Sequence, residues 1–166
     1  MGVSVASPKT IPKLVLLQTL SPSGSASVAT SALAVYSRYR VEWELYGPSG
    51  EVRLTINSDG GANYTFNKRV AASVSQTTGA AYISLVATDA NVLSVGSFDC
   101  AGLTPAAASA VITLNIQSTT NAAYSGPYPS DGYWVAGSAV QVSTFTFTAS
   151  SLTFTGTIRI YGVRNE

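Results

Sequence analysis

The stretch Tyr36–Phe66 constrains the fold more than any other part of the sequence. Apolar residues occupy every second position from 39 to 45 and again from 52 to 56, with charged or polar residues between them. A period of two is typical of a β-strand with one buried and one solvent-facing side. The segment 47–50 (Gly-Pro-Ser-Gly) has the composition of a turn. The stretch therefore predicts an antiparallel hairpin of two half-buried strands.

Charge is concentrated in this hairpin. Of the 17 Lys, Arg, Asp and Glu residues in the chain, seven lie between positions 36 and 66. Charged residues make up 10% of the whole sequence, compared with roughly 25% in a typical soluble domain. A weakly charged surface rich in Ser and Thr suits a protein that packs against neighbours, although many small β domains share it. The net charge of +1 gives no electrostatic argument for a nucleic-acid partner or an anionic membrane.

The rest of the chain contains short strand-like segments separated by turn residues, with no helical period. Together with the hairpin they give about eight to ten strands. We therefore expect an all-β fold, an antiparallel jelly-roll-like β-sandwich that forms one domain over residues 13–166. Residues 1–12 are small and polar and contain two prolines, so we expect an extended N-terminal arm that lies on a neighbouring subunit. The strands are expected at 13–20, 64–74, 80–87, 91–98, 111–117, 140–147 and 152–163, and 25–35 fits either a strand or a short helix.

Glycines mark two special backbone positions. Gly60 and Gly61 follow Ser58 and Asp59, which predicts a tight turn with positive φ angles. Gly156 falls on the apolar face of the last expected strand. A glycine there predicts a β-bulge or a close approach by another backbone.

The side chains needed for catalysis are scarce. The chain has no histidine, which removes the commonest general base and metal ligand. The single cysteine, Cys100, has no imidazole partner and is interpreted as a small apolar filler. Glu42 and Glu44 would stand about 7 Å apart on one strand face, which is within the range for the carboxylate pair of a glycosidase. They alternate with Arg38 and Arg40, however, which indicates an ordinary charged face.

Asn57, Asp59 and Asn63 could in principle ligate calcium. Their loop has one carboxylate and lacks the spacing of an EF-hand, which favours turn chemistry over a metal site. We therefore expect no enzyme activity, no catalytic residues, no cofactor and no metal.

Targeting signals are also missing from the sequence. Apolar runs are short: Leu14–Leu17 has four residues and no run exceeds five, whereas a membrane-spanning helix needs about 20. The first ten residues lack the basic start, apolar stretch and cleavage site of a signal peptide. We expect a protein made in the cytoplasm that has no membrane partner.

One segment could carry recognition. Residues 119–131 form the longest expected irregular segment, and aromatic residues cluster in and just after it. Rigid aromatic rings on a proline-stiffened loop are typical of sugar-binding and protein-binding surfaces. The alternative, which we prefer, is that these rings cover one open end of the sandwich or pack on a neighbouring subunit. The candidate recognition or packing residues are Tyr124, Tyr128, Asp131, Tyr133 and Trp134.

Parts of the sequence resemble small jelly-roll proteins of tailed-bacteriophage virions. The group has a strand of the form Tyr-x-x-Tyr-x-hydrophobic-x-hydrophobic, matched by Tyr36–Leu45, and then a strand ending in Arg-Leu-x-hydrophobic-Asn, matched by Arg53–Asn57. A loop resembling Asn-Gly-Asp-Thr-Gly-Ala-Asn-Tyr follows, matched by Asn57–Tyr64, and the closing residues Thr157–Val163 resemble the usual ending of the group. Two positions depart from it: Ser58 stands where the group tends to have Gly, and Gly60 where it tends to have Thr.

The resemblance implies a structural role in the virion. Head decoration proteins, head fibres and tail receptor-binding modules look alike, so the resemblance does not distinguish among them. Fold analogy alone does not fix the function. We expect first a capsid decoration (cement) protein, a homotrimer that binds the major capsid protein or other virion proteins on the outside of the head. The alternative is a tail or fibre module that binds a host receptor or glycan through the aromatic segment.

Overall fold

The computed structural model describes residues 13–47, 50–70, 73–88, 92–101, 111–120, 128–136 and 140–164. The expected N-terminal arm, residues 1–12, lies outside this range. The described residues form twelve strands and no helix, and therefore no helix long and apolar enough to cross a membrane. The strands are β1 (Lys13–Leu20), β2 (Ser27–Ala29), β3 (Arg38–Gly47), β4 (Gly50–Ile56), β5 (Tyr64–Val70), β6 (Ser73–Ala80), β7 (Ile83–Thr88), β8 (Val92–Ala101), β9 (Val111–Thr120), β10 (Tyr128–Val135), β11 (Phe145–Ala149) and β12 (Thr155–Arg164).

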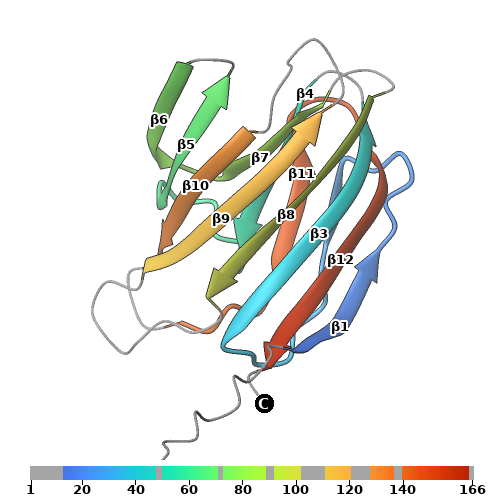
Figure 1. Ribbon diagram of the computed structural model, residues 1–166, viewed down its shortest axis with the longest axis vertical. Coiled ribbons are helices and arrows are strands. Elements are labelled where there is room, and N and C mark those ends of the chain that lie inside the picture. The colour runs from blue at the N-terminus through green and yellow to red at the C-terminus, as the bar shows by residue number, and fades with distance from the viewer. Residues whose placement is uncertain are drawn as a thin grey trace, which may run out of the picture.

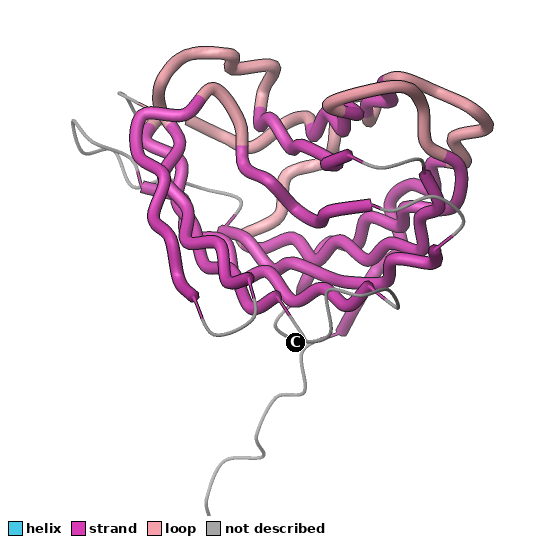
Figure 2. Tube along the Cα trace, turned by 90° about the horizontal axis from the view of Figure 1, so that it is seen from above, coloured by secondary structure: helices cyan, strands magenta, loops and turns pink. Residues whose placement is uncertain are grey.

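The strands form two antiparallel sheets packed as a β-sandwich (Figure 1). The wide sheet has eight strands in the order β1-β12-β3-β8-β9-β10-β5-β6, and the narrow sheet has four in the order β2-β11-β4-β7. Figure 2 looks along the layers and shows the wide sheet curving toward the narrow one. The expected antiparallel all-β sandwich is confirmed.

Eight of the strands pair in the nested pattern of a jelly roll. The first pairs with the last (β1 with β12), the second with the second-last (β2 with β11), the third with β8, and the fourth with β7. This is the pairing of a long hairpin ribbon that is folded over on itself. Successive strand pairs along the ribbon then lie alternately in the wide sheet and in the narrow sheet. This is how a jelly roll closes around one core.

Two hairpins are inserted into this plan. The β5–β6 hairpin lies between β4 and β7 in the chain, and the β9–β10 hairpin lies between β8 and β11. They pair with each other through β10 and β5, and with the jelly roll through β9 and β8. Together they extend the wide sheet by four strands beyond β8 (Figure 1).

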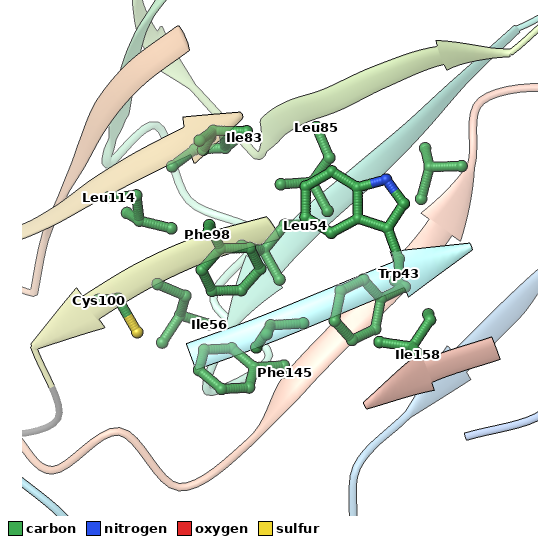
Figure 3. Close-up of a cluster of buried hydrophobic side chains, with 14 of the residues drawn as sticks. Trp43, Leu54, Ile56, Ile83, Leu85, Phe98, Cys100, Leu114, Phe145 and Ile158 are labelled. Carbon is green, nitrogen blue, oxygen red and sulfur yellow. The ribbon is translucent and has the colours of Figure 1, made fainter. Parts of the chain in front are cut away.

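Aromatic rings from both sheets meet at the centre of the core (Figure 3). Phe145 of the narrow sheet packs edge-on against Phe98 of the wide sheet, with ring centroids 5.5 Å apart, and against Tyr39 at 5.8 Å. Phe98 also contacts Trp43 at 6.2 Å. Such pairs add about 0.5–1.5 kcal/mol each beyond the area that they bury. The inward positions of the predicted hairpin, 39–45 and 52–56, are all buried here.

Gly156 confirms the expected close approach between two backbones. Its φ angle is 144°, and a β-carbon built on it would overlap the carbonyl oxygen of Glu44 on β3 and stand 3.0 Å from the Cα of Leu45. The pairing of β12 with β3 continues through this position without a shift in register. Glycine is therefore required so that the two strands can lie this close.

The expected positive φ angles at Gly60 and Gly61 are wrong. The left-handed residues of this turn are Asn57, with φ of 53°, and Ser58, with φ of 57°. Asn57 tolerates this conformation because its side-chain oxygen accepts hydrogen bonds from the backbone N–H groups of Ser143 (2.8 Å) and Thr144 (3.2 Å). The turn is thus held by its link to the segment before β11.

Ser58→Gly is expected to stabilise the protein by about 0.5–1 kcal/mol, because glycine adopts the left-handed conformation without the steric cost that serine bears. Chemical denaturation checks this. Ser58→Ala is the matched control, since alanine keeps the β-carbon and should change the free energy of unfolding little. A glycine variant no more stable than the alanine variant would contradict the expected strain.

Two of the twelve strands were not expected from the sequence. β6 is polar and uncharged, with no alternation of apolar residues, and β10 contains Pro129 and Gly132, which favour a loop. The irregular segment expected at 119–131 is corrected at both ends. Residues 119–120 finish β9 and residues 128–131 begin β10, whereas 121–127 lie outside the described part.

Candidate functional surface

Among the candidate residues whose side chains the structure describes, Tyr133 and Trp134 face opposite sides of the sheet. Tyr124 lies outside the described residues, and Tyr128 is the first residue of β10. Tyr133 is 38% exposed, whereas Trp134 beside it is 3% exposed and belongs to the core. Neighbouring residues of a strand point to opposite sides of the sheet, so Tyr133 faces outward with Asp131 while Trp134 faces inward. Trp134 is therefore a packing residue.

Trp134 fixes one end of the sandwich. Its ring stacks on Tyr64 of β5, with ring centroids 6.3 Å apart and 19° between the planes. Its Nε1–H donates to Oδ2 of Asp59 at 2.6 Å, and Oδ2 also accepts from Nδ2 of Asn63 at 2.9 Å. The Tyr64 hydroxyl donates to the carbonyl of Asp59 at 3.0 Å and accepts from the backbone N–H of Ile56 at 2.9 Å. These contacts join the 57–63 turn to β10 and β5.

The Asp59 carboxylate is occupied by protein donors. Burial raises the pKa of this carboxyl, but hydrogen bonds from Asn63, Trp134 and the Gly61 N–H together lower it by more. The pKa therefore lies below its ordinary value of 3.8. The bonds favour the charged form because each donor is better satisfied by a carboxylate than by a neutral acid. This arrangement supports the interpretation of the 57–63 loop as turn chemistry.

Asp59→Asn is expected to reduce the dependence of stability on acid. Because the folded protein holds this carboxyl with a lowered pKa, the unfolded chain binds more protons, and stability falls as the pH drops below about 4. The variant should be less stable than the wild type at pH 7, and the difference should shrink toward pH 2–3. Urea titrations across that pH range measure it. Asp131→Asn controls for the loss of one negative charge, and an equal pH profile for the two variants would contradict the assignment.

The outer face of the wide sheet carries a group of paired charges. Nε of Arg40 donates to Glu42 at 2.9 Å and its Nη1 to Asp99 at 3.4 Å, while Nη1 of Arg159 donates to Glu44 at 3.1 Å. The Arg40–Asp99 pair joins β3 to β8 and the Arg159–Glu44 pair joins it to β12, whereas Arg40 and Glu42 are both on β3. They are partly exposed, so each contributes only about 0–1 kcal/mol. Both carboxylates that could have served as an acid/base pair are thus engaged by arginines.

A shallow hollow of about 320 Å³ lies among these charges. Gly96 and Trp43 stand opposite each other in the β3–β8 pairing at this point. The charged residues around the hollow neutralise one another, which suits contact with a polar protein surface better than capture of a charged small molecule. Its lining residues are Arg40, Glu42, Trp43, Glu44, Val95, Gly96, Ser97 and Arg159.

The structure also shows an exposed apolar strip that sequence reasoning missed. Leu14 is 45% exposed and Leu16 54% exposed, and both lie on β1 at the edge of the wide sheet. The run Leu14–Leu17 is apolar throughout, so its pattern does not tell which residues face solvent.

The cysteine is buried as expected. Cys100 is 2% exposed on β8, and burial raises the pKa of its thiol. Within the described residues, no three His, Cys, Asp or Glu side chains come together as a metal site. No protein-family model matches the chain, and no curated protein matches its sequence.

Proposed function

We infer that this chain is a non-enzymatic structural protein of a tailed-phage virion, and that it acts as a capsid decoration protein. The observation that carries the proposal is where the virion-like segments fall. Tyr36–Leu45 leads into and forms most of β3, Arg53–Asn57 ends β4, and Asn57–Tyr64 forms the turn that Trp134 and Tyr64 hold. The resemblance therefore coincides with interior strands of the two sheets and with a turn that is anchored by hydrogen bonds.

The state of the chemically capable side chains supports a structural role. Glu42 and Glu44 are ion-paired, Asp59 accepts hydrogen bonds from the turn and from Trp134, and the Cys100 thiol is buried. A decoration protein needs none of these groups for chemistry. It needs a stable fold and surfaces that bind to the capsid.

In this role the protein would stabilise the head by burying surface across capsomer junctions. Apolar area removed from water contributes about 25 cal/mol per Å². An oligomer, which we expect to be a trimer, presents several such surfaces at once, so that weak contacts add up to firm binding. The outer face of the wide sheet, with its mutually paired charges, suits a polar protein surface of this kind.

The direct test is addition of the purified chain to expanded heads of the parent phage that lack it. We expect saturable binding and a higher temperature for heat-induced release of DNA. A variant without residues 1–12 should bind more weakly if the arm contributes, and undiminished binding would remove the arm from the proposal. Heads that neither bind the chain nor gain heat resistance would contradict the decoration role.

The competing proposal is a tail or fibre module that binds a host receptor. It is favoured by Tyr133, whose exposed ring lies on the same strand face as Asp131, and Asn67 donates a hydrogen bond to that aspartate at 3.1 Å. Binding to host glycans or cells that Tyr133→Ala abolishes would support it. Because Trp134 is buried, a loss of binding in Trp134→Ala would reflect loss of structure.

A further inference from the structure

The two ends of the wide sheet are β1 and β6, and on each of these strands one edge pairs with no other described strand. The narrow sheet offers less room for pairing. Its edge strand β2 has three residues, and its other edge strand β7 lies against β9 and β5 of the inserted hairpins. Unpaired edges expose backbone N–H and C=O groups that can bind a further strand.

Of these two edges, β1 offers the better surface for pairing with a further strand. Leu14 and Leu16 are exposed on the same side of the strand, two residues apart, and the strand is regular from Lys13 to Leu16 before the irregularity between Leu16 and Gln18. β6 presents mainly Ser, Gln and Thr, with one exposed apolar residue, Val74, and it is interrupted near Gly79. Natural proteins usually protect edges with charges, prolines or bulges, and the first half of β1 has only Lys13.

We propose that the first half of β1 is a self-association surface, and that it pairs antiparallel with the same segment of a second copy across a two-fold axis. With Val15 on the axis, Leu14 of each copy lies opposite Leu16 of the other. The four leucines that are exposed in two separate copies then form two direct cross-strand pairs. The irregularity after Leu16 lies just beyond the paired residues and does not interrupt them.

Charge and symmetry favour a second copy as the occupant. In this register each Lys13 lies opposite Leu17 of the other copy, so the two ammonium groups stand at opposite ends of the interface, about 13 Å apart along the strands. An antiparallel edge is complementary to itself, which is what a two-fold contact requires. The contact is short compared with the roughly 1,200 Å² of a stable interface, so the association should be weak and should depend on concentration.

A two-fold contact of this kind doubles the number of copies in the oligomer that forms without it. A monomer would give a dimer, and a trimer would give a hexamer. Neighbouring copies held close together on a particle would pair more readily than free ones. The inference concerns the isolated chain, however, and does not rest on the proposed virion function. Failure of the test below would leave that function untouched, and failure of head binding would leave this surface untouched.

The first test is sedimentation velocity of the full chain from low to high micromolar concentration. We expect the wild type to double in mass with concentration, and the Leu14→Lys/Leu16→Lys variant to weaken the doubling by at least about tenfold because it places two ammonium groups directly opposite each other in each cross-strand pair. Val74→Lys, on the β6 edge, is the matched control and should leave the doubling intact. A wild type that never doubles, or doubling that responds to Val74 and not to the leucines, would overturn the proposal.

The second test fixes the register and does not depend on how well a charged variant folds. Val15→Cys places a thiol on the axis, where antiparallel neighbours have Cα atoms about 4.5–5.5 Å apart, within the range for a disulfide. Cys100 should not compete because its thiol is buried and its pKa is raised. Mild oxidation should give a covalent dimer of Val15→Cys and none of Val74→Cys. Equal cross-linking of both variants, or none of Val15→Cys, would contradict the assigned pairing.

Discussion

Gly156→Ala is expected to destabilise the protein by about 3–6 kcal/mol, a large part of the 5–15 kcal/mol that typically holds a domain folded. Two costs combine. The φ angle of 144° is one that residues with a β-carbon rarely adopt, and the new methyl group would overlap the Glu44 carbonyl across the β3–β12 pair. Relief would require these strands to separate, and β12 joins β1 to the rest of the wide sheet. Chemical denaturation followed by tryptophan fluorescence measures the loss.

Gly60→Ala is the matched control for this substitution. Gly60 has no atom within 4 Å of the position that a β-carbon would take, and its φ angle is not in the left-handed region. The change should therefore alter the free energy of unfolding by no more than about 0.5 kcal/mol. If the two alanine variants proved equally stable, β12 and β3 could not approach each other as the structure describes.

Trp134→Ala is expected to cost about 3–5 kcal/mol, the usual range for removal of a buried tryptophan ring. The variant loses the stack on Tyr64 and leaves Asp59 without its closest donor. Trp134→Phe keeps an aromatic ring but not the N–H, and should lose about 1.5–3 kcal/mol, the range for a hydrogen bond to a charged group. Thermal or chemical unfolding of both variants separates the ring from the hydrogen bond.

Tyr133→Ala is the control for this pair, because Tyr133 is the adjacent residue on the opposite side of the same strand. Its partly exposed ring should contribute less than about 1 kcal/mol. A Tyr133 variant as unstable as Trp134→Ala would mean that the two side chains are not on opposite sides of β10. The same variants then test recognition, since Tyr133 is exposed at the surface and Trp134 is not.

The sequence predicted the centre of the fold well because its signal there is local. In the hairpin of β3 and β4, the alternation of apolar and polar residues predicts both that the segments are strands and which side of each strand faces inward. Every inward position from 39 to 45 is buried. Gly156 was informative for a similar reason, since a glycine on an apolar strand face needs a local steric explanation. The nested pairing of distant strands, by contrast, is set by tertiary contacts that no local pattern encodes.

The candidate site was harder to predict. Pro129 and Gly132 are typical of loops, yet both lie in β10, where Gly132 allows close packing against Thr65 and Phe66 of β5. Treating that segment as a loop grouped Tyr133 with Trp134, whereas a strand places them on opposite sides. The exposed leucines of β1 could not be identified because a continuous apolar run fits a buried strand as well as an edge.

The measurement that tests the central proposal most directly is immunogold labelling of intact virions of the parent phage with an antibody to this chain. The proposal predicts label distributed over the head, removed by prior absorption of the antibody with the purified protein. Label confined to the tail tip would contradict the decoration role and favour receptor binding through the Tyr133 face. Absence of label from virions that are shown to contain other structural proteins would contradict a place in the virion altogether.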